Sequence, residues 1–364
     1  MRLVSPLLKR AVYPTLAKAG VFRRMAAEGL SIVTYHGVLP ADYQIIDPAL
    51  DGSLVHADGF RRQLQLLRAN YNVISPEQML QWCEGKTNLP PRAVLVTCDD
   101  GLVNVVTDML PILSEQKIPC LFFVIGLCSE DTPQMLWYEQ LYLMLTAAGE
   151  QKFSVQFGDV EIVGMAGTEL QRRALWRELT QALEKYDHEY CSRFVDTVRT
   201  QLGLSENFVP AHLAEPSARK RFGLLGPAEL RALLSAGMSV GAHTLSHPML
   251  SKLPEDRAWF EIVAGRRRLE NILGREVWAF AYPFGGPSAV SGREFGMAER
   301  AGYKAAFLSF GGGFGARLPR YSLPRIHVAG DMNLPEFEAH VSGFYRDLRQ
   351  KFGREEKCPA MPAA

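Results

Sequence analysis

Two pairs of residues in this chain could together hydrolyse a bond with the help of one metal ion. Asp99 and Asp100 stand side by side after an apolar run, and His243 and His247 lie four residues apart much further along. Two histidines at that spacing can face the same way and share one cation. One carboxylate completes the three protein ligands that catalytic zinc commonly takes while a fourth position stays open for water. The second carboxylate then remains as a base.

The elements around these residues decide whether they can meet. The apolar run 93–98 predicts a buried strand, and adjacent residues on a regular strand point to opposite faces. Both carboxylates therefore reach one site only if the strand ends before them, and Gly101 permits such a turn. Asp-Asp-Gly alone is also a common turn. A buried run that ends in two carboxylates, however, is costly unless the charges have partners.

Strands and helices alternate along most of the chain, and this favours parallel pairing in an α/β architecture. The hydrophobic patterns predict strands at 30–38, 71–74, 93–98, 121–125, 238–240, 278–281 and 305–308. Catalytic groups of a barrel cluster at the carboxyl ends of its strands. Asp99, Asp100 and His243 fall at such ends, and we therefore expect a barrel with its active site there.

Three ordered motifs resemble those of the polysaccharide deacetylases, carbohydrate esterase family four. Residues 97–101, Thr-Cys-Asp-Asp-Gly, are similar to the family's Thr-Phe-Asp-Asp-Gly signature. Residues 243–247, His-Thr-Leu-Ser-His, are similar to its second motif, and Phe-Ala-Tyr-Pro-Phe-Gly at 280–285 to its third. Stretches at 33–38, 118–124 and 323–326 fit the same family. The resemblance covers roughly residues 30–130 and 225–330, and it implies a distorted (β/α) barrel of about seven strands.

The resemblance also implies a role for each member of the site. Asp100, His243 and His247 would bind a divalent metal, with zinc as the default, and Asp99 would be the base. The family often has an arginine that orients this base where Ala281 stands here. Arg325 is the expected substitute for that arginine.

Further residues in or near these motifs are expected to line the pocket. His327 would act as general acid, with a satisfied structural histidine as the alternative. The backbone N–H of Phe284 resembles an oxyanion donor, with an apolar strand end as the alternative. His36 and Tyr282 end strands and would line the substrate site. Ser246 lies between the two histidines, but the chain has no Gly-x-Ser-x-Gly elbow, which disfavours a serine hydrolase.

The chain divides into a basic segment at 1–29, a barrel at 30–345 and a polar tail at 346–364. Within the barrel, a mainly helical insertion at about 132–225 breaks the strand–helix rhythm. It should contain a hairpin around Gly158-Asp159 and a charged helix from Leu170 to Tyr190, and we expect it to pack over one mouth of the barrel. Trp137 and Tyr138 at its start are candidates for stacking on a sugar, with core packing as the alternative.

Composition sets further bounds on the function. The net charge of +1 over 364 residues gives no indication of a nucleic-acid partner. Six cysteines without a Cys-x-x-Cys pair indicate reduced thiols and a cytoplasmic protein. No convincing signal peptide precedes the barrel.

The first 27 residues carry six basic side chains, no acid and an apolar stripe, which is compatible with binding to an anionic membrane surface. A helix packed on the barrel is the alternative, and Pro6 and Pro14 favour an interrupted helix.

Together these patterns predict a metal-dependent hydrolase. Its expected reaction is removal of N-acetyl groups from an acetylated amino sugar in a glycan or a lipid-linked glycan precursor. We expect it in the cytoplasm, with peripheral binding at the inner membrane face as a further hypothesis. One alternative is a hydrolase of another non-peptide C–N bond, such as a cyclic amide. The other is a catalytically silent barrel that binds glycan.

Overall fold

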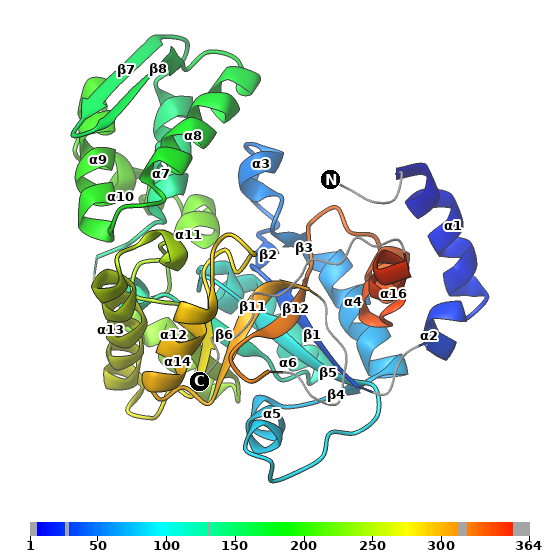
Figure 1. The fold of residues 1–364 in the computed structure, drawn as a ribbon. Helices are drawn as coiled ribbons and strands as arrows, with labels where there is room; N and C mark the ends of the chain where they lie inside the picture. The colour runs from blue at the N-terminus through cyan, green and yellow to red at the C-terminus, as the bar shows by residue number, and fades with distance from the viewer. Residues whose placement is uncertain (1–5, 26–28, 130–131, 312–318, 352–364) are drawn as a thin grey trace.

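Seven parallel strands close into a barrel at the centre of the molecule (Figure 1). The computed structural model describes residues 6–25, 29–129, 132–311 and 319–351. Around the barrel the strands follow the order β1 (Leu30–Tyr35), β12 (Leu323–His327), β11 (Ala305–Gly311), β10 (Ala279–Ala281), β9 (Ser239–Ala242), β6 (Leu121–Val124) and β5 (Ala93–Cys98). Pairing of β5 with β1 closes the ring, and the short β4 (Asn72–Val73) pairs with the start of β5. The predicted distorted barrel of about seven strands is confirmed.

The register of the strands brings their carboxyl ends to one level. β1 and β5 pair without a shift from Leu30 opposite Ala93 to Tyr35 opposite Cys98. β6 and β9 likewise pair to their last residues, where Val124 is opposite Ala242. The residues that follow β1, β5 and β9 therefore emerge at the same mouth of the barrel. These are the segments that carry the motif residues.

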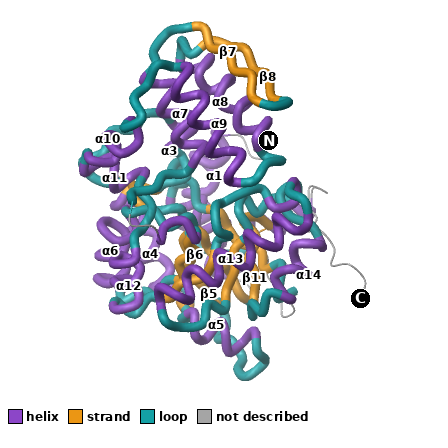
Figure 2. The backbone as a smooth tube through the Cα atoms, turned by 90° about the vertical axis from the view of Figure 1, so that its left-hand side faces the viewer, coloured by secondary structure: helices purple, strands orange, loops and turns teal. Residues whose placement is uncertain are grey.

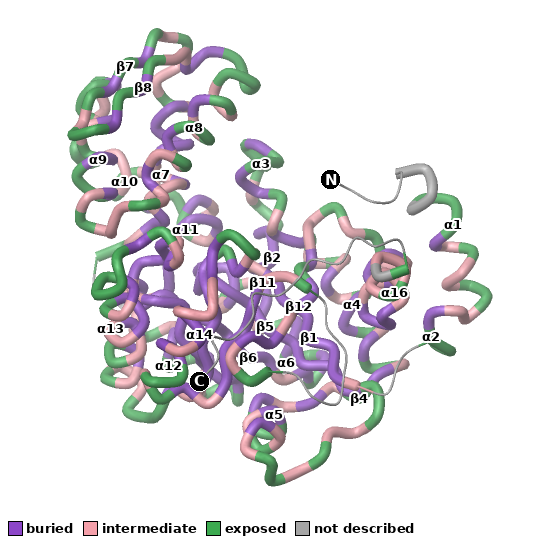
Figure 3. Tube along the Cα trace, viewed as in Figure 1, coloured by how far each residue is buried: buried purple, intermediate pink, exposed green. Residues whose placement is uncertain are grey.

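The strands are buried on both faces, because side chains fill the barrel and helices cover it. Every residue of β1, β5, β6, β9 and β10 is buried (Figure 3). Alternate side chains, such as Leu95, Phe123 and Phe307, form an inner layer. The intervening ones, such as Val94 and Val96, pack under the surrounding helices. Continuous apolar runs are typical of strands covered in this way.

Helices surround the barrel (Figure 2). Along the chain they are α3 (Pro48–Asp51), α4 (Ala57–Asn70), α5 (Pro76–Cys83), α6 (Leu110–Gln116), α12 (Pro227–Ser235), α13 (Glu255–Leu273), α14 (Gly292–Arg300), α15 (Leu334–Val341) and α16 (Phe344–Lys351). A π-helical turn, Val105–Met109, leads into α6, and two short strands, β2 (Val38–Leu39) and β3 (Val55–His56), pair beside α3 and α4.

Between β6 and β9 the chain forms a second, mainly helical lobe. Its elements are α7 (Trp137–Ala147), β7 (Lys152–Phe157), β8 (Val160–Met165), α8 (Glu169–Leu183), α9 (His188–Gln201), α10 (Phe208–Ala214) and α11 (Pro216–Phe222). This lobe stands above one mouth of the barrel and has a hydrophobic core of its own (Figures 1 and 2). The expected hairpin is confirmed as β7 and β8. The expected single helix from Leu170 to Tyr190 is wrong, because the Asp187 carboxylate accepts the N–H of Tyr190 at 3.0 Å and starts a new helix.

The basic N-terminal segment forms α1 (Pro6–Lys18) and α2 (Val21–Met25), beside α16 (Figure 1). The expected interruption of α1 is wrong, because the helix continues through Pro14. Tyr13 and Phe22 are buried against Ala339 of α15, as the alternative of a packed helix predicted. No described helix is long and apolar enough to cross a bilayer. Residues 352–364 of the expected polar tail lie outside the described residues, and its start belongs to α16.

Candidate metal centre and pocket

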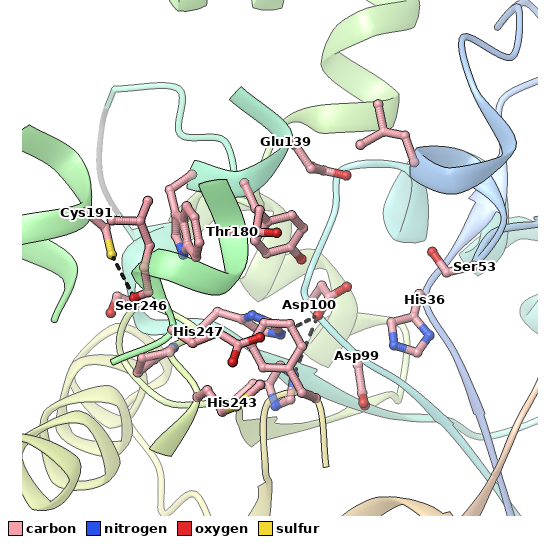
Figure 4. A pocket seen from close by; sticks show the side chains of 18 of the residues that line it. His36, Ser53, Asp99, Asp100, Glu139, Thr180, Cys191, His243, Ser246 and His247 are labelled. Atoms are coloured by element: carbon pink, nitrogen blue, oxygen red, sulfur yellow. Dashed lines mark hydrogen bonds and ion pairs between the residues drawn. The ribbon is translucent and has the colours of Figure 1, made fainter. Parts of the chain in front are cut away.

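The two adjacent carboxylates leave the end of β5 through a tight three-residue turn. The N–H of Gly101 donates to the carbonyl oxygen of Asp99 at 3.0 Å, and Asp100 between them has φ +73°. Gly101 itself has φ +78°, and a Cβ atom there would lie 2.8 Å from Val124 Cγ1. The strand has thus ended before Asp100, as the sequence required. Both carboxylates consequently lie at the same mouth of the barrel (Figure 4).

Asp100, His243 and His247 converge on one point. Their potential ligand atoms all lie within 4.8 Å of one another, and all three residues are buried. Asp100 Oδ1 is 3.5 Å from His243 Nε2 and 3.4 Å from His247 Nε2 (Figure 4). This oxygen is buried and accepts no hydrogen bond from the described part of the chain. A buried carboxylate oxygen without a donor is costly. One oxygen and two imidazole nitrogens form a ligand set that suits a divalent cation, so these residues fit the metal that the sequence predicted.

The protonation states in this cluster also suit a metal. Burial raises the pKa of Asp100, but His243 and His247 beside it outweigh this effect and hold its pKa well below the usual range. Burial lowers the pKa of His247. Asp100 is therefore ionised and His247 neutral at neutral pH, which are the forms that bind metal.

Contacts behind the ligands fix the direction of the first histidine. His243 Nδ1–H donates to the carbonyl oxygen of Ala281 at 2.7 Å, which leaves Nε2 to face Asp100. Such a hydrogen bond sets the tautomer of a metal-binding histidine and its ring orientation. The position where the family often has arginine therefore contributes its backbone to the site.

The loop between the two histidines is folded by its own backbone and hydroxyl groups. Thr244 and His247 have φ +65° and +64°, conformations that L-residues rarely adopt. The hydroxyl of Thr244 donates to the His243 carbonyl oxygen at 2.5 Å and accepts the N–H of His247 at 2.9 Å. The two imidazoles thus meet through this turn rather than through one face of a helix.

Glu261 of α13 holds this loop, and the sequence analysis missed it. Its carboxylate accepts the N–H groups of Leu245 and Ser246 at 3.1 and 2.9 Å and the Ser246 hydroxyl at 2.6 Å. Gly265 lets the helix approach, since a Cβ there would lie 2.4 Å from Thr244 C. The Ser246 hydroxyl is therefore engaged as a donor to Glu261. This contact agrees with the sequence argument against a serine hydrolase. Glu261 lies among other charged residues of an amphipathic helix, so no local signal distinguishes it.

Asp99 and Arg325 form a buried, two-pronged ion pair. Arg325 Nη1 donates to Asp99 Oδ1 at 2.7 Å and Nη2 to Oδ2 at 2.6 Å. The guanidinium is fixed in turn by the carbonyl oxygen of Leu308 at 2.6 Å and the Thr97 hydroxyl at 3.2 Å. Burial raises the pKa of Asp99, but the positive charge of Arg325 outweighs it and lowers the net value. Arg325 thus lies beside Asp99, the residue next to which the sequence analysis expected it.

A cavity of about 370 Å³ opens above these groups, between the barrel and the helical lobe. Asp99, Asp100, His36, His327 and Phe284 line it from the barrel. The rings of His36 and His327 are 4.8 Å apart. Burial, followed by the nearby His36, lowers the pKa of His327 to about 4, so this side chain is neutral at neutral pH.

Two residues of the third motif differ in their surroundings. Phe284 has φ +59° at the centre of a turn that Gly285 closes by donating to Pro283 at 2.6 Å, and its ring lies 4.8 Å from that of His247. Tyr282, in contrast, is fully buried; its hydroxyl donates to the Tyr321 carbonyl oxygen at 2.9 Å. It is not among the residues that line the cavity, so the structure contradicts its expected place at the substrate. Tyr282 is instead a packing residue.

The helical lobe supplies the opposite wall of the cavity. Trp137 and Tyr138 both line it, and their rings meet edge to face at 5.6 Å. The Tyr138 ring is 5.9 Å from that of His247, one of the three candidate metal ligands. Both residues are half-buried, so they combine packing with access to the cavity. Trp176 and Glu139 also line this wall, and the sequence analysis missed both.

Comparisons with known proteins identify the family and the fold. The sequence profile of the family described as polysaccharide deacetylase matches residues 86–144 and 167–306, more than half of the chain. A deacetylase of Streptococcus pyogenes, PplD, solved with acetate, has a similar fold, with TM-score 0.53 and 18% identity over 87% of this chain and 99% of that one.

Two further solved structures share the fold. IcaB from Ammonifex degensii has TM-score 0.53 and 18% identity over 86% of this chain and 97% of that one. A de-N-acetylase of Aggregatibacter actinomycetemcomitans has TM-score 0.52 and 12% identity over 85% and 99%. At these identities the likeness shows the fold alone. No curated protein matches the chain.

Proposed function

Since this chain belongs to the polysaccharide deacetylase family, and is thus a hydrolase of carbon–nitrogen bonds, we propose that it removes N-acetyl groups from an acetylated amino sugar. The sugar would belong to a glycan or to a lipid-linked glycan precursor, and the reaction would depend on a divalent metal, zinc by default. One observation carries this proposal. Asp100, His243 and His247 converge within 4.8 Å beside Asp99, a second carboxylate with its own cationic partner.

Each group would have a separate task in the reaction. Asp100, His243 and His247 would hold a divalent cation, which would lower the pKa of a water molecule and polarise the acetamide carbonyl. Asp99 accepts the proton of the attacking water. Arg325 occupies one lone pair on each Asp99 oxygen, and a second lone pair on each remains for that proton.

Two further residues that line the cavity from the barrel would complete the reaction. The backbone N–H of Phe284 would donate to the carbonyl oxygen as it gains negative charge. His327 would pass a proton to the leaving amine. Because the lowered pKa of His327 keeps it neutral in the free protein, it would receive the proton that Asp99 took from the water and pass it to the amine, and Asp99 would end the reaction ionised again. This sequence of transfers leaves acetate and a free amino sugar.

Acetate release tests the proposal most simply. Purified protein, loaded with zinc, would be offered a panel of N-acetylated sugars, oligosaccharides and lipid-linked glycans. We expect acetate from at least one of them, and acetate release slower by about 10²–10⁴-fold from the Asp99→Asn variant. If only cyclic amides are opened and no acetamide is cleaved, the chain hydrolyses another C–N bond and the proposal fails.

We also propose that the N-terminal helices bring the protein to an anionic membrane surface in the cytoplasm. Arg10, Lys18 and Arg24 are exposed on α1 and α2, and each basic residue near such a surface contributes about 1 kcal/mol, screened by salt. The protein should co-sediment with anionic vesicles at low salt and leave them as salt rises. A variant without residues 1–25 should lose this binding. Equal sedimentation of both proteins would refute the idea.

A further inference from the structure

A buried cluster of three charged residues joins the helical lobe to the loop that follows the first barrel strand. Arg221 of α11 donates through Nε to Asp51 of α3 at 2.6 Å and through Nη1 to Glu139 of α7 at 2.8 Å. Its Nη2 donates to the Leu50 carbonyl oxygen at 2.9 Å. All three charged side chains are at least nine-tenths buried. Burial on this scale requires that each polar atom have a partner.

The two carboxylates of this cluster differ in that respect. Both oxygens of the Asp51 carboxylate accept hydrogen bonds. The donors are the Tyr43 hydroxyl at 3.1 Å, the N–H of Ile46 at 3.0 Å and Arg221. Glu139 uses only Oε1. Its Oε2 is buried and accepts no hydrogen bond from any described residue.

Glu139 also faces the catalytic cavity, whereas Asp51 is not among the lining residues. Figure 4 shows its side chain above Asp100, on the wall that the helical lobe contributes. The residue that carries the unmet oxygen therefore lines the same cavity as Asp100, His243 and His247. Arg221 pairs with both carboxylates, and burial still raises the pKa of Glu139 to about 7, so a further donor at Oε2 would stabilise its ionised form.

We propose that Glu139 binds the substrate by accepting a hydrogen bond from a sugar hydroxyl at its Oε2. The inference rests on the proposed function and names what the site recognises besides the acetamide. A site built to hydrogen-bond a hydroxyl rejects an analogue that lacks it, because a buried polar group is then left unpaired. Glu139 thus selects a hydroxylated ring over a simple acetamide. Arg221 is the positioning residue that holds its carboxylate in place.

Substitution of each carboxylate in turn separates this role from a structural one. In Glu139→Gln the amide oxygen must turn to Arg221, which directs the NH₂ group at the cavity, where it cannot accept. Asp51→Asn is the matched control, since it disturbs the same guanidinium from outside the cavity. The assay measures kcat and KM on the glycan from which the wild type releases most acetate.

We expect both variants to lower the melting temperature, and only Glu139→Gln to raise KM, by about 10- to 100-fold, while kcat changes little. Equal KM for the two variants would overturn the role of Glu139 and leave the proposed function intact. If the wild type releases no acetate from any glycan, the proposed function fails and this inference fails with it. Should Glu139→Gln not fold, Glu139→Asp keeps the charge beside Arg221 but withdraws the free oxygen, and the same rise in KM is expected.

Discussion

Removal of Arg325 should destabilise the protein more than removal of any exposed cation. In Arg325→Ala the Asp99 carboxylate stays buried without its partner, since the two side chains are 0% and 2% exposed in the pair. Breaking a buried ion pair by removing one member costs about 3–5 kcal/mol, because the other charge is left uncompensated. Arg325→Ala also frees the Leu308 carbonyl oxygen, which Arg325 Nε contacts at 2.6 Å. We therefore expect a loss near the upper part of that range.

Urea unfolding, followed by tryptophan fluorescence, measures this loss. Lys185→Ala is the matched control, because the Lys185–Asp159 pair has a similar separation of 2.9 Å but is 56% and 63% exposed. That control should not change stability measurably. The double variant Asp99→Asn/Arg325→Ala should be more stable than Arg325→Ala alone, because it leaves no unpaired charge. A loss in Arg325→Ala no larger than in the control would refute this reasoning.

The same variant should change how stability depends on pH. In the wild type the lowered pKa of Asp99 gives stability that is fully present above its unfolded pKa and is lost as pH falls through its folded pKa. Without Arg325, burial is no longer outweighed by that cation, and we expect the folded pKa to rise above the unfolded value of about 3.9. The free energy of unfolding that Arg325→Ala loses relative to the wild type should then be smaller at about pH 5 than at about pH 8. If the stability lost relative to the wild type instead became smaller as pH rises, the unpaired Asp99 charge would not be its cause.

Three further variants probe the site. Asp99→Asn should keep the metal but lose about 10²–10⁴-fold in kcat, and near wild-type turnover would exclude Asp99 as the base. Glu261→Gln should weaken metal affinity by about 10–100-fold, because the His243–His247 loop loses the carboxylate that fixes it. Titration of the apo-protein with zinc measures this affinity, and an unchanged affinity would refute the prediction. Trp137→Ala should raise KM for the glycan while the melting temperature holds; a large fall in melting temperature with unchanged KM would show that Trp137 only packs.

Local sequence was sufficient for the strands and for the groups at their ends. Asp99 and Asp100 follow a continuous apolar run, and in a parallel barrel the end of such a run has a known place. The spacing of His243 and His247 allowed a shared cation, and the resemblance to the family selected Asp100 as the third ligand. Arg325 was expected as a substitute only through the resemblance to the family, and the structure places it beside Asp99.

Residues that depend on tertiary contacts could not be predicted in this way. Glu139 and Arg221 are 82 positions apart, and Arg221 and Asp51 are 170 apart, so only the folded chain brings them together. Nothing in the sequence distinguishes Glu261 from other acids of its helix. Tyr282 was misplaced because successive residues at the end of a strand point to opposite faces. A shift of one position therefore moves a side chain from the cavity into the core.

Metal content and acetate release, measured together on one preparation, test the central claim most directly. The wild type should bind about one divalent ion per chain, lose activity with a chelator and regain it with zinc. His243→Ala removes one of the three ligands and should lose metal and activity together, while its fold is retained. Full acetate release from metal-free protein, or from His243→Ala, would contradict the account.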